Sequence, residues 1–177
     1  MPVLKAAHLR RLLCLLSCLA AAAPAVAQDV PEYRLKAAFV YNFMVFTEWP
    51  DDTAPELTLC IVGRDPFGAE IDAVARKRVA HRAIAIQRLA VEASLSNCQV
   101  VFIARSAITQ LERVLDKLAD RHVLTVADTQ GAMQRGVQLN MEVKDSKVTF
   151  EANLDAARRH HLQLSSKLLQ LATEVKQ

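Results

Sequence analysis

Glycine is scarce in this chain, with four residues among 177. Walker loops and GxGxxG loops, which bind nucleotides, and the GxSxG turn of serine hydrolases all need glycines at fixed spacing. None of these patterns occurs here, and spacing identifies no nucleophile with an accompanying base. We therefore expect a protein that is not an enzyme and that needs no cofactor.

The chain also lacks an excess of positive charge once its first 27 residues are set aside. Those residues hold three of the 22 basic side chains and no acidic one, so residues 28–177 carry 19 basic and 19 acidic side chains. Proteins that bind nucleic acids need surplus Lys and Arg to displace counterions from phosphates. The charge balance argues against a nucleic-acid partner and against a polybasic contact with a membrane surface.

Residues 1–27 have the pattern of a secretory signal peptide. A basic start ends at Arg11, an apolar run covers residues 12–23, and residues 25–27 are the small-x-small site Ala-Val-Ala. The apolar run is shorter than the roughly 20 residues of a membrane-spanning helix, and a lipoprotein signal at Cys18 is a further alternative. We expect cleavage after Ala27, export to a periplasm and no membrane insertion of the mature chain.

Signal cleavage would leave two of the four cysteines, Cys60 and Cys98. An even pair in an oxidising compartment favours one disulfide, and two separate buried thiols are the alternative. The spacing excludes a CxxC redox or zinc motif. His160 and His161 are adjacent, and adjacent side chains on a helix point about 100° apart, so they are not expected to share a metal ion. We therefore predict no metal site.

Apolar patterning predicts an α/β fold. A first helix of about four turns carries apolar residues nearly all round and ends at Trp49 and Pro50. Buried strands are predicted over residues 57–62, 83–89, 98–103 and 122–126. Helices are predicted over residues 69–78 and from a cap at Ser106 to Leu118. Alternation over residues 137–143 and 148–152 predicts an antiparallel hairpin.

The last segment has the most regular helical spacing. Its apolar positions step by three or four residues and are Leu154, Ala157, His161, Leu164, Leu168, Leu171 and Val175. This pattern predicts a long amphipathic helix that packs on the core or, alternatively, forms the seam of a homodimer. The expected fold is one three-layer α/β domain over residues 28–177. It has a mostly parallel sheet, a C-terminal antiparallel hairpin and flanking helices, including this long one.

Two segments are candidate binding sites. The first helix carries Tyr41 and Met44 on a wide apolar side, which we interpret as a contact surface for a protein partner. The turn over residues 63–68 joins a strand to a helix, where open parallel sheets place ligands and free amides favour anions. Arg64 and Asp65 in that turn are the candidate ligand contacts. The alternative function is therefore a periplasmic protein that binds a small anion or an aromatic metabolite.

Several motifs in order resemble the YfiR family of periplasmic proteins. The opening signature is LKAAFVYNF over residues 35–43 followed by FTEWP over residues 46–50. It is followed by CIVG at 60–63, DPFG at 65–68, CQVVFI at 98–103, FEAN at 150–153 and LSSKLLQLA at 164–172. The resemblance covers residues 33–172, and the opening signature is its most specific part.

This resemblance implies a regulator without enzymatic activity. Family members repress a membrane-anchored diguanylate cyclase by binding its periplasmic domain, which lowers cyclic-di-GMP synthesis and affects biofilm formation. Their fold is a sheet flanked by helices, and they tend to self-associate. By the resemblance, Cys60 and Cys98 match the family's structural cysteine pair, so folding would depend on oxidation. A second pair found in some relatives is missing here.

Overall fold

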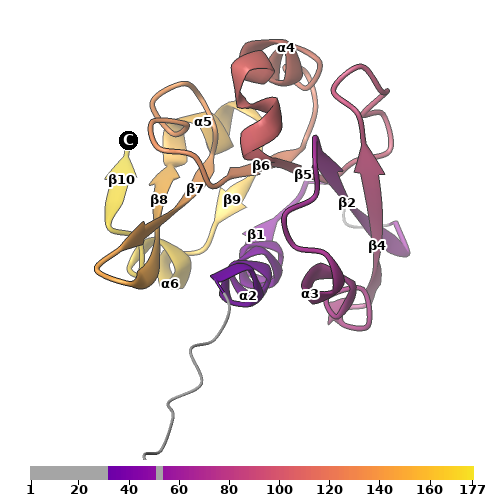
Figure 1. Cartoon of the computed structure of the whole chain (residues 1–177), viewed down its shortest axis with the longest axis horizontal. Helices are drawn as coiled ribbons and strands as arrows, with labels where there is room; N and C mark the ends of the chain where they lie inside the picture. The colour runs from indigo at the N-terminus through magenta and orange to yellow at the C-terminus, as the bar shows by residue number, and fades with distance from the viewer. Residues whose placement is uncertain (1–31, 51–53) are drawn as a thin grey trace, which may run out of the picture.

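The computed structural model describes residues 32–50 and 54–177, and an eight-stranded sheet forms its centre (Figure 1). The strand order is β10-β8-β7-β6-β5-β2-β4-β3. These strands are β2 (Glu56–Val62), β3 (Arg78–Val79), β4 (Arg82–Leu89), β5 (Val100–Ile103), β6 (Leu124–Ala127), β7 (Leu139–Lys144), β8 (Lys147–Asn153) and β10 (Glu174–Lys176). A separate two-stranded sheet pairs β1 (Thr47–Glu48) with β9 (Gln163–Leu164).

The middle of the main sheet is parallel. Strands β4, β2, β5, β6 and β7 run in one direction in that spatial order. All four residues of β5 and of β6 are buried, and in β2 every residue after Glu56 is buried. Strands covered on both faces consist of continuous apolar runs. The predicted mostly parallel sheet is therefore confirmed.

The predicted hairpin is also present. β7 and β8 pair antiparallel from Leu139 opposite Ala152 to Lys144 opposite Lys147. Asp145 and Ser146 form the connection with φ values of 49° and 60°. Two central residues with positive φ match the right-handed twist of the strands that they join, which fixes the register of the hairpin.

Helices cover both faces of the sheet. α2 (Glu32–Val45), α3 (Ala69–Asp72) and α6 (Ser166–Leu169) lie below it in Figure 1, whereas α4 (Leu111–Asp116), which follows the 3-10 helix η2 (Arg105–Gln110), lies above. The core has two parts accordingly. Phe43 and Phe102 belong to the part on the α2 side, and Leu111 belongs to the part on the α4 side. This is the expected three-layer arrangement.

The predicted long C-terminal helix is wrong. The segment forms α5 (Leu154–Arg159), then β9, α6 and β10. His161 has a φ of 56° and ends α5: its amide donates to Arg158 O, and the amide of Leu162 donates to Ala157 O. This is the left-handed helix end known as the Schellman motif. Ser165 then caps α6 by accepting a hydrogen bond from the Leu168 amide. The predicted dimer seam is therefore not one continuous helix face.

Three other predicted helix boundaries differ. α2 ends at Val45, before Trp49, because Thr47 already pairs with Leu164. The helix expected over residues 69–78 is α only to Asp72 and continues as turns. Ser106 does not cap a helix, since its hydroxyl accepts a hydrogen bond from the Arg64 amide at 2.8 Å.

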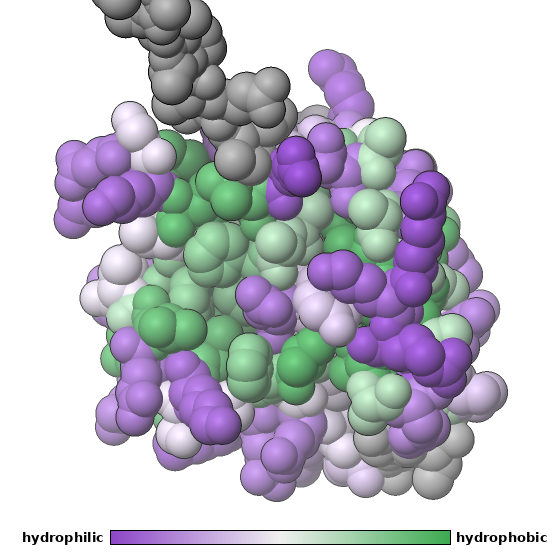
Figure 2. All heavy atoms as spheres, turned by 90° about the horizontal axis from the view of Figure 1, so that it is seen from below, coloured by the Kyte–Doolittle hydropathy of each residue, from purple (hydrophilic) through white to green (hydrophobic). Residues whose placement is uncertain are grey.

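The underside of the molecule, seen in Figure 2, carries a broad apolar surface on the side of α2 and α6. Large hydrophobic side chains that are exposed in the described residues are Leu35, Val45, Val143 and Leu171, and the first two belong to α2. Within residues 32–50 and 54–177, no helix has the length and apolar character required to cross a membrane. The predicted signal peptide lies outside the described residues.

A disulfide joins Cys60 in β2 to Cys98 just before β5. The Sγ–Sγ distance is 1.99 Å, the Cα–Cα distance is 5.8 Å and 38 positions separate the two residues. Both residues are buried in the part of the core on the α4 side. The bond therefore ties β2 to the segment that enters β5, which begins at Val100 and not at the predicted residue 98. The disulfide that the sequence favours is present.

Removing this bond should destabilise the protein markedly. For a loop closed over 38 positions, the chain-entropy model gives about 4 kcal/mol of lost stability. We expect the Cys60→Ala/Cys98→Ala variant to show this loss in urea unfolding. Wild-type protein unfolded with a reductant is the matched control, because it loses the bond without losing the sulfur atoms. Equal unfolding midpoints for reduced and oxidised wild type would contradict the expectation.

Candidate functional site

Lys36, in the second turn of α2, has a side chain with no exposed area. Its Nζ lies 2.6 Å from Oδ2 of Asp128, and it also forms an ion pair with Glu32, one helical turn earlier. Burying an ammonium group away from water costs several kcal/mol unless a well-placed partner compensates for it. The position of α2 on the sheet therefore depends on the carboxylate of Asp128.

Asp128 is the centre of a network of charged and polar side chains. It directly follows β6, and its side chain has no exposed area. Besides Lys36, its Oδ2 accepts a hydrogen bond from the Tyr33 hydroxyl at 3.0 Å and forms an ion pair with Arg105 at 3.3 Å. Arg105 also donates from Nε to the backbone oxygen of Asp128 at 3.2 Å.

We call these five residues (Glu32, Tyr33, Lys36, Arg105 and Asp128) the Asp128 network. It contains two cations and two carboxylates, so its formal charges balance. Arg105 also lies 3.5 Å from Glu32. Arg105 follows β5 and Asp128 follows β6. The network thus fastens the first two turns of α2 to the carboxyl ends of two central strands.

This environment raises the pKa of the Tyr33 hydroxyl. Burial, together with the negative charge of the Asp128 carboxylate and the hydrogen bond to it, raises the pKa of the Tyr33 hydroxyl from 10.0 to about 12. Each cause favours the neutral phenol, because the phenolate would be poorly hydrated and would face a carboxylate. The tyrosine therefore acts as a hydrogen-bond donor to Asp128.

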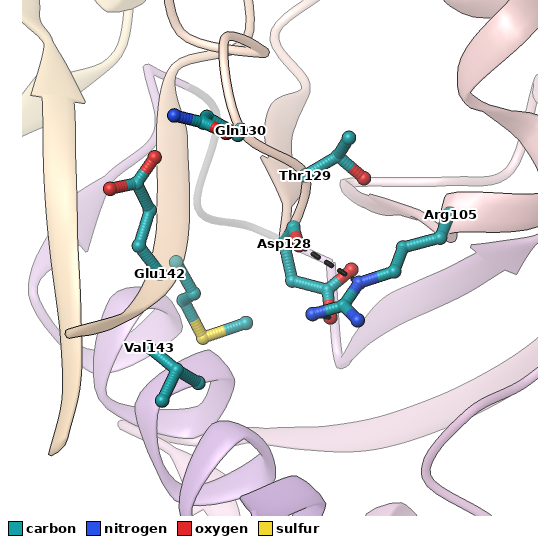
Figure 3. Close-up of a pocket in the computed structure, with 7 residues that line it drawn as sticks. Arg105, Asp128, Thr129, Gln130, Glu142 and Val143 are labelled. Carbon is teal, nitrogen blue, oxygen red and sulfur yellow. Dashed lines mark hydrogen bonds and ion pairs between the residues drawn. The ribbon is translucent and has the colours of Figure 1, made fainter. Parts of the chain in front are cut away.

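A hollow of about 380 Å³ opens beside Asp128 (Figure 3). Glu142 lies on the opposite side of this hollow from Arg105. The lining residues are Arg105, Asp128, Thr129, Gln130, Met141, Glu142 and Val143. We call it the Asp128 hollow. Five of its seven lining residues are charged or polar, and two are apolar.

The two residues that the sequence proposes for partner contact lie in different environments. Met44 has no exposed area and belongs to the core, so it offers no surface, and Met44→Glu would unfold the protein rather than test an interface. Tyr41 is partly exposed. Its hydroxyl donates to Arg78 O at 3.1 Å, and Lys77 Nζ lies 4.3 Å from its ring centre.

The turn over residues 63–68 uses much of its hydrogen-bonding capacity internally. The amide of Arg64 donates to Ser106 Oγ, and the amide of Phe67 donates to Oδ1 of Asp65. The other carboxylate oxygen of Asp65 binds Arg88 at 2.7 Å. A Cβ at Gly63 would lie 2.7 Å from Ser106 Oγ, so the space beside this turn is filled. Arg64 is exposed and lies at the surface.

Three histidines, His122, His160 and His161, lie together near the end of α5. Nδ1 of His122 lies 3.1 Å from His160 O, and the His122 and His161 rings are 5.2 Å apart. Within the part of the chain that the structure describes, no three His, Cys, Asp or Glu side chains converge as metal ligands do. His160 and His161 lie at the end of α5 and past it, so they are not neighbours within one helix.

Sequence reasoning did not single out Lys36, Asp128 or Arg105. A signal for Lys36 was present, because it is the one charged residue in the run LKAAFVYNF over residues 35–43. Asp128 and Arg105 each follow a buried strand closely. Which residues would meet depended on how α2 crosses the sheet, and the sequence does not show this.

The Lys36–Asp128 pair should be strongly coupled in stability. Lys36→Met leaves the Asp128 carboxylate buried without its main partner, which should cost about 3–5 kcal/mol. Lys36→Met combined with Asp128→Asn removes both charges and should recover more than half of that loss. Urea unfolding of the wild type, both single variants and the double variant measures the coupling. Additive losses would contradict a direct dependence of one residue on the other.

The phenolic proton of Tyr33 should be held unusually tightly. The chain has two tyrosines, so in a Tyr41→Phe variant only Tyr33 contributes a phenolate absorbance signal. We expect a midpoint near pH 12 in the folded protein, compared with 10.0 for an ordinary tyrosine. Because the folded state binds this proton more tightly, stability should fall as the pH rises between these two values. A midpoint near pH 10 with native circular dichroism would contradict this.

Comparison with solved structures finds the same fold at low identity. A conserved domain protein from Vibrio cholerae O1 biovar El Tor matches with a TM-score of 0.56 and 10% identity, over 84% of this chain and 61% of that chain. The ABC domain from Streptococcus pneumoniae in complex with L-Trp matches with a TM-score of 0.55 and 7% identity, over 81% of this chain and 60% of that chain. This chain thus spans about three fifths of each.

None of the curated proteins matches this chain. A family model does: the one described as YfiR/HmsC-like covers residues 33–173. That span runs from Tyr33 in the Asp128 network, through the disulfide and the hairpin, to the residue before β10. The chain therefore belongs to the YfiR/HmsC-like family.

Proposed function

We propose that this protein is a periplasmic, non-enzymatic negative regulator of an inner-membrane diguanylate cyclase. It binds the periplasmic domain of the cyclase and lowers cyclic-di-GMP synthesis. Membership of the YfiR/HmsC-like family is the observation that carries this proposal. The exposed apolar side of α2 supports it, because a regulator of this kind needs a surface for its partner.

The contact surface that we propose is the outer face of α2, which we define as Leu35, Ala38, Asn42 and Val45, with Tyr41 at its border. Leu35 is 38% exposed and Val45 is 41% exposed. Ala38 and Asn42 are exposed between them. Protein interfaces combine apolar and polar side chains, and three of the four residues that define this face are apolar.

The fold holds this face rigid before a partner arrives. The inner side of α2 packs Val40 and Phe43 into the core, and Phe43 contacts the ring of Phe150 at 5.0 Å between centroids. The Asp128 network fixes the start of the same helix through Lys36. A preorganised surface loses little conformational entropy on binding, which favours affinity.

Repression would work by population shift. A protein outside the membrane silences a cyclase only if it binds the inactive conformation of the sensor more tightly than the active one. The shift cannot exceed that difference in affinity. The Cys60–Cys98 disulfide makes this activity depend on oxidative folding, since the bond ties β2 to the segment entering β5.

A charge on the outer face of α2 should abolish repression. We would co-produce the protein with each membrane-bound diguanylate cyclase of the same genome that has a periplasmic domain, and measure cellular cyclic-di-GMP by mass spectrometry. The wild type should lower the level for one of them. Val45→Glu should lose this effect, because an unpaired carboxylate buried in an interface weakens binding by about tenfold or more. Tyr41→Glu should weaken it as well.

The matched control is Ala119→Glu. Ala119 is exposed and follows α4 on the other side of the sheet, so this variant adds the same charge away from α2. It should repress as the wild type does. If Val45→Glu is folded by circular dichroism and still represses fully, α2 is not the contact surface. If the wild type lowers cyclic-di-GMP with none of the cyclases, the proposed function is wrong.

The second candidate function is the binding of a small molecule. The observation that favours it is the Asp128 hollow of about 380 Å³, rather than the turn with Arg64 and Asp65, whose groups are engaged by Ser106 and Arg88. The solved ABC domain holds L-Trp, which shows that a protein of this fold binds a small molecule.

A further inference from the structure

The connection between β4 and β5 ends in Cys98, one half of the disulfide. We call residues 90–98 the Cys98 strap. It contains no helix or strand and lies beyond the arrowhead of β4 in Figure 1. Its backbone hydrogen bonds are internal: the amide of Ala93 donates to Ala90 O at 3.1 Å, and that of Cys98 donates to Leu95 O at 3.0 Å. The remaining carbonyl groups of the strap therefore need other donors.

Two cations on the α4 side supply these donors. Lys117 directly follows α4, and Arg121 comes four residues later. Nζ of Lys117 lies 2.7 Å and 3.0 Å from its two acceptors. The acceptors are the backbone oxygens of Val91 and Ala93 for Lys117, and those of Leu95, Ser96 and Cys98 for Arg121. Among the described residues, these five bonds are the hydrogen bonds that join the strap to the rest of the protein.

Both cations serve the strap rather than an acidic side chain. Neither Lys117 nor Arg121 forms an ion pair within residues 32–50 and 54–177. Hydrogen bonds from an ionised donor are roughly twice as strong as neutral ones. A hollow of about 430 Å³ lies along these contacts, so solvent borders them. The strap is therefore held mainly by two side chains whose removal would leave its carbonyl groups to water.

The strap also covers the disulfide. Its side chains Val91 and Leu95 are buried in the same part of the core as Cys60 and Cys98. The two cysteines are 0% and 1% exposed. A reductant in solution therefore does not reach either sulfur atom while the strap is in place.

The two cysteines differ in how firmly their backbones are held. Cys60 lies in the middle of β2, opposite Gln87 of β4 and Val101 of β5. Cys98 belongs to the strap. Segments with few backbone hydrogen bonds to their surroundings open at a lower free energy than central strands do. Opening of the strap would expose Sγ of Cys98 while β2 stays in the sheet.

We propose that the Cys98 strap opens without global unfolding, and that Lys117 and Arg121 control the reduction of the disulfide by holding the strap closed. In the open form, a thiolate of a dithiol reductant attacks Sγ of Cys98, and Cys60 leaves as a thiolate. The second thiol of the reductant then releases Cys98 and closes the reductant into a cyclic disulfide. Two electrons and two protons pass to the protein. The proposal does not depend on binding to a cyclase.

Reduction kinetics in urea concentrations below the unfolding transition test whether the opening is local. Purified oxidised protein would be mixed with excess dithiothreitol, and free thiols would be alkylated and counted by mass spectrometry. Urea promotes a process in proportion to the surface that the process exposes. For the wild type we expect a rate proportional to dithiothreitol concentration, with a urea dependence less than about half of the m-value of global unfolding.

Two variants test the role of the cations. Arg121→Gln should be reduced at least about tenfold faster than the wild type, which corresponds to about 1.4 kcal/mol, because the strap loses three hydrogen bonds. Lys117→Met should also be reduced faster. Removing a cation lowers the local concentration of a thiolate reductant, so an acceleration would not come from the change of charge.

The matched control is Arg113→Gln. Arg113 is exposed on α4, one turn before Lys117, and it donates no hydrogen bond to the strap. This variant removes the same charge from the same helix, and its disulfide should be reduced at the rate of the wild type.

Two results would overturn the proposal. The first is reduction of the wild type with the full urea dependence of global unfolding, or at a rate independent of dithiothreitol concentration, since the bond would then be reduced only in unfolded molecules. The second is reduction of Arg121→Gln and Lys117→Met no faster than that of Arg113→Gln. Cyclic-di-GMP repression is measured separately in cells, so either result leaves the proposed regulatory function intact.

Discussion

The burial of Lys36 against Asp128 is the constraint on which the described structure depends. An ammonium group with no exposed area is tolerated only where a carboxylate meets it, and that carboxylate lies directly after the central strand β6. This requirement fixes where α2 crosses the sheet. It also determines which residues of α2 face outward. Arg105 pairs with the same carboxylate and lines the hollow.

The two faces of the sheet are secured by different chemistry. On the α4 side, the disulfide between Cys60 and Cys98 joins β2 to the entry of β5 covalently. On the α2 side, the ion pair between Lys36 and Asp128 joins the helix to the end of β6. Well-packed apolar residues often stabilise a core as much as a buried ion pair does. We therefore interpret the ion pair as a device that sets the position of α2 rather than as a source of stability.

The sequence predicts the centre of this fold well and its periphery poorly, for physical reasons. Residues 57–62 and 100–103 are apolar on both faces, and this pattern has few alternatives to a buried parallel strand. The C-terminal segment shows that periodicity alone is insufficient, because the left-handed conformation of His161 and the cap at Ser165 interrupt a regular apolar pattern. At the candidate site, the residue types were visible, but Lys36 and Asp128 are 92 positions apart. Only the crossing of α2 over β6 brings them together.

The same helix takes part in both of the proposed functions. Its outer face with Leu35 and Val45 is open to a partner, and its first turns share Asp128 with the hollow. A ligand in the hollow affects partner binding only if it favours one position of α2 over another. Any such coupling is reciprocal, so a bound partner would change ligand affinity by the same factor.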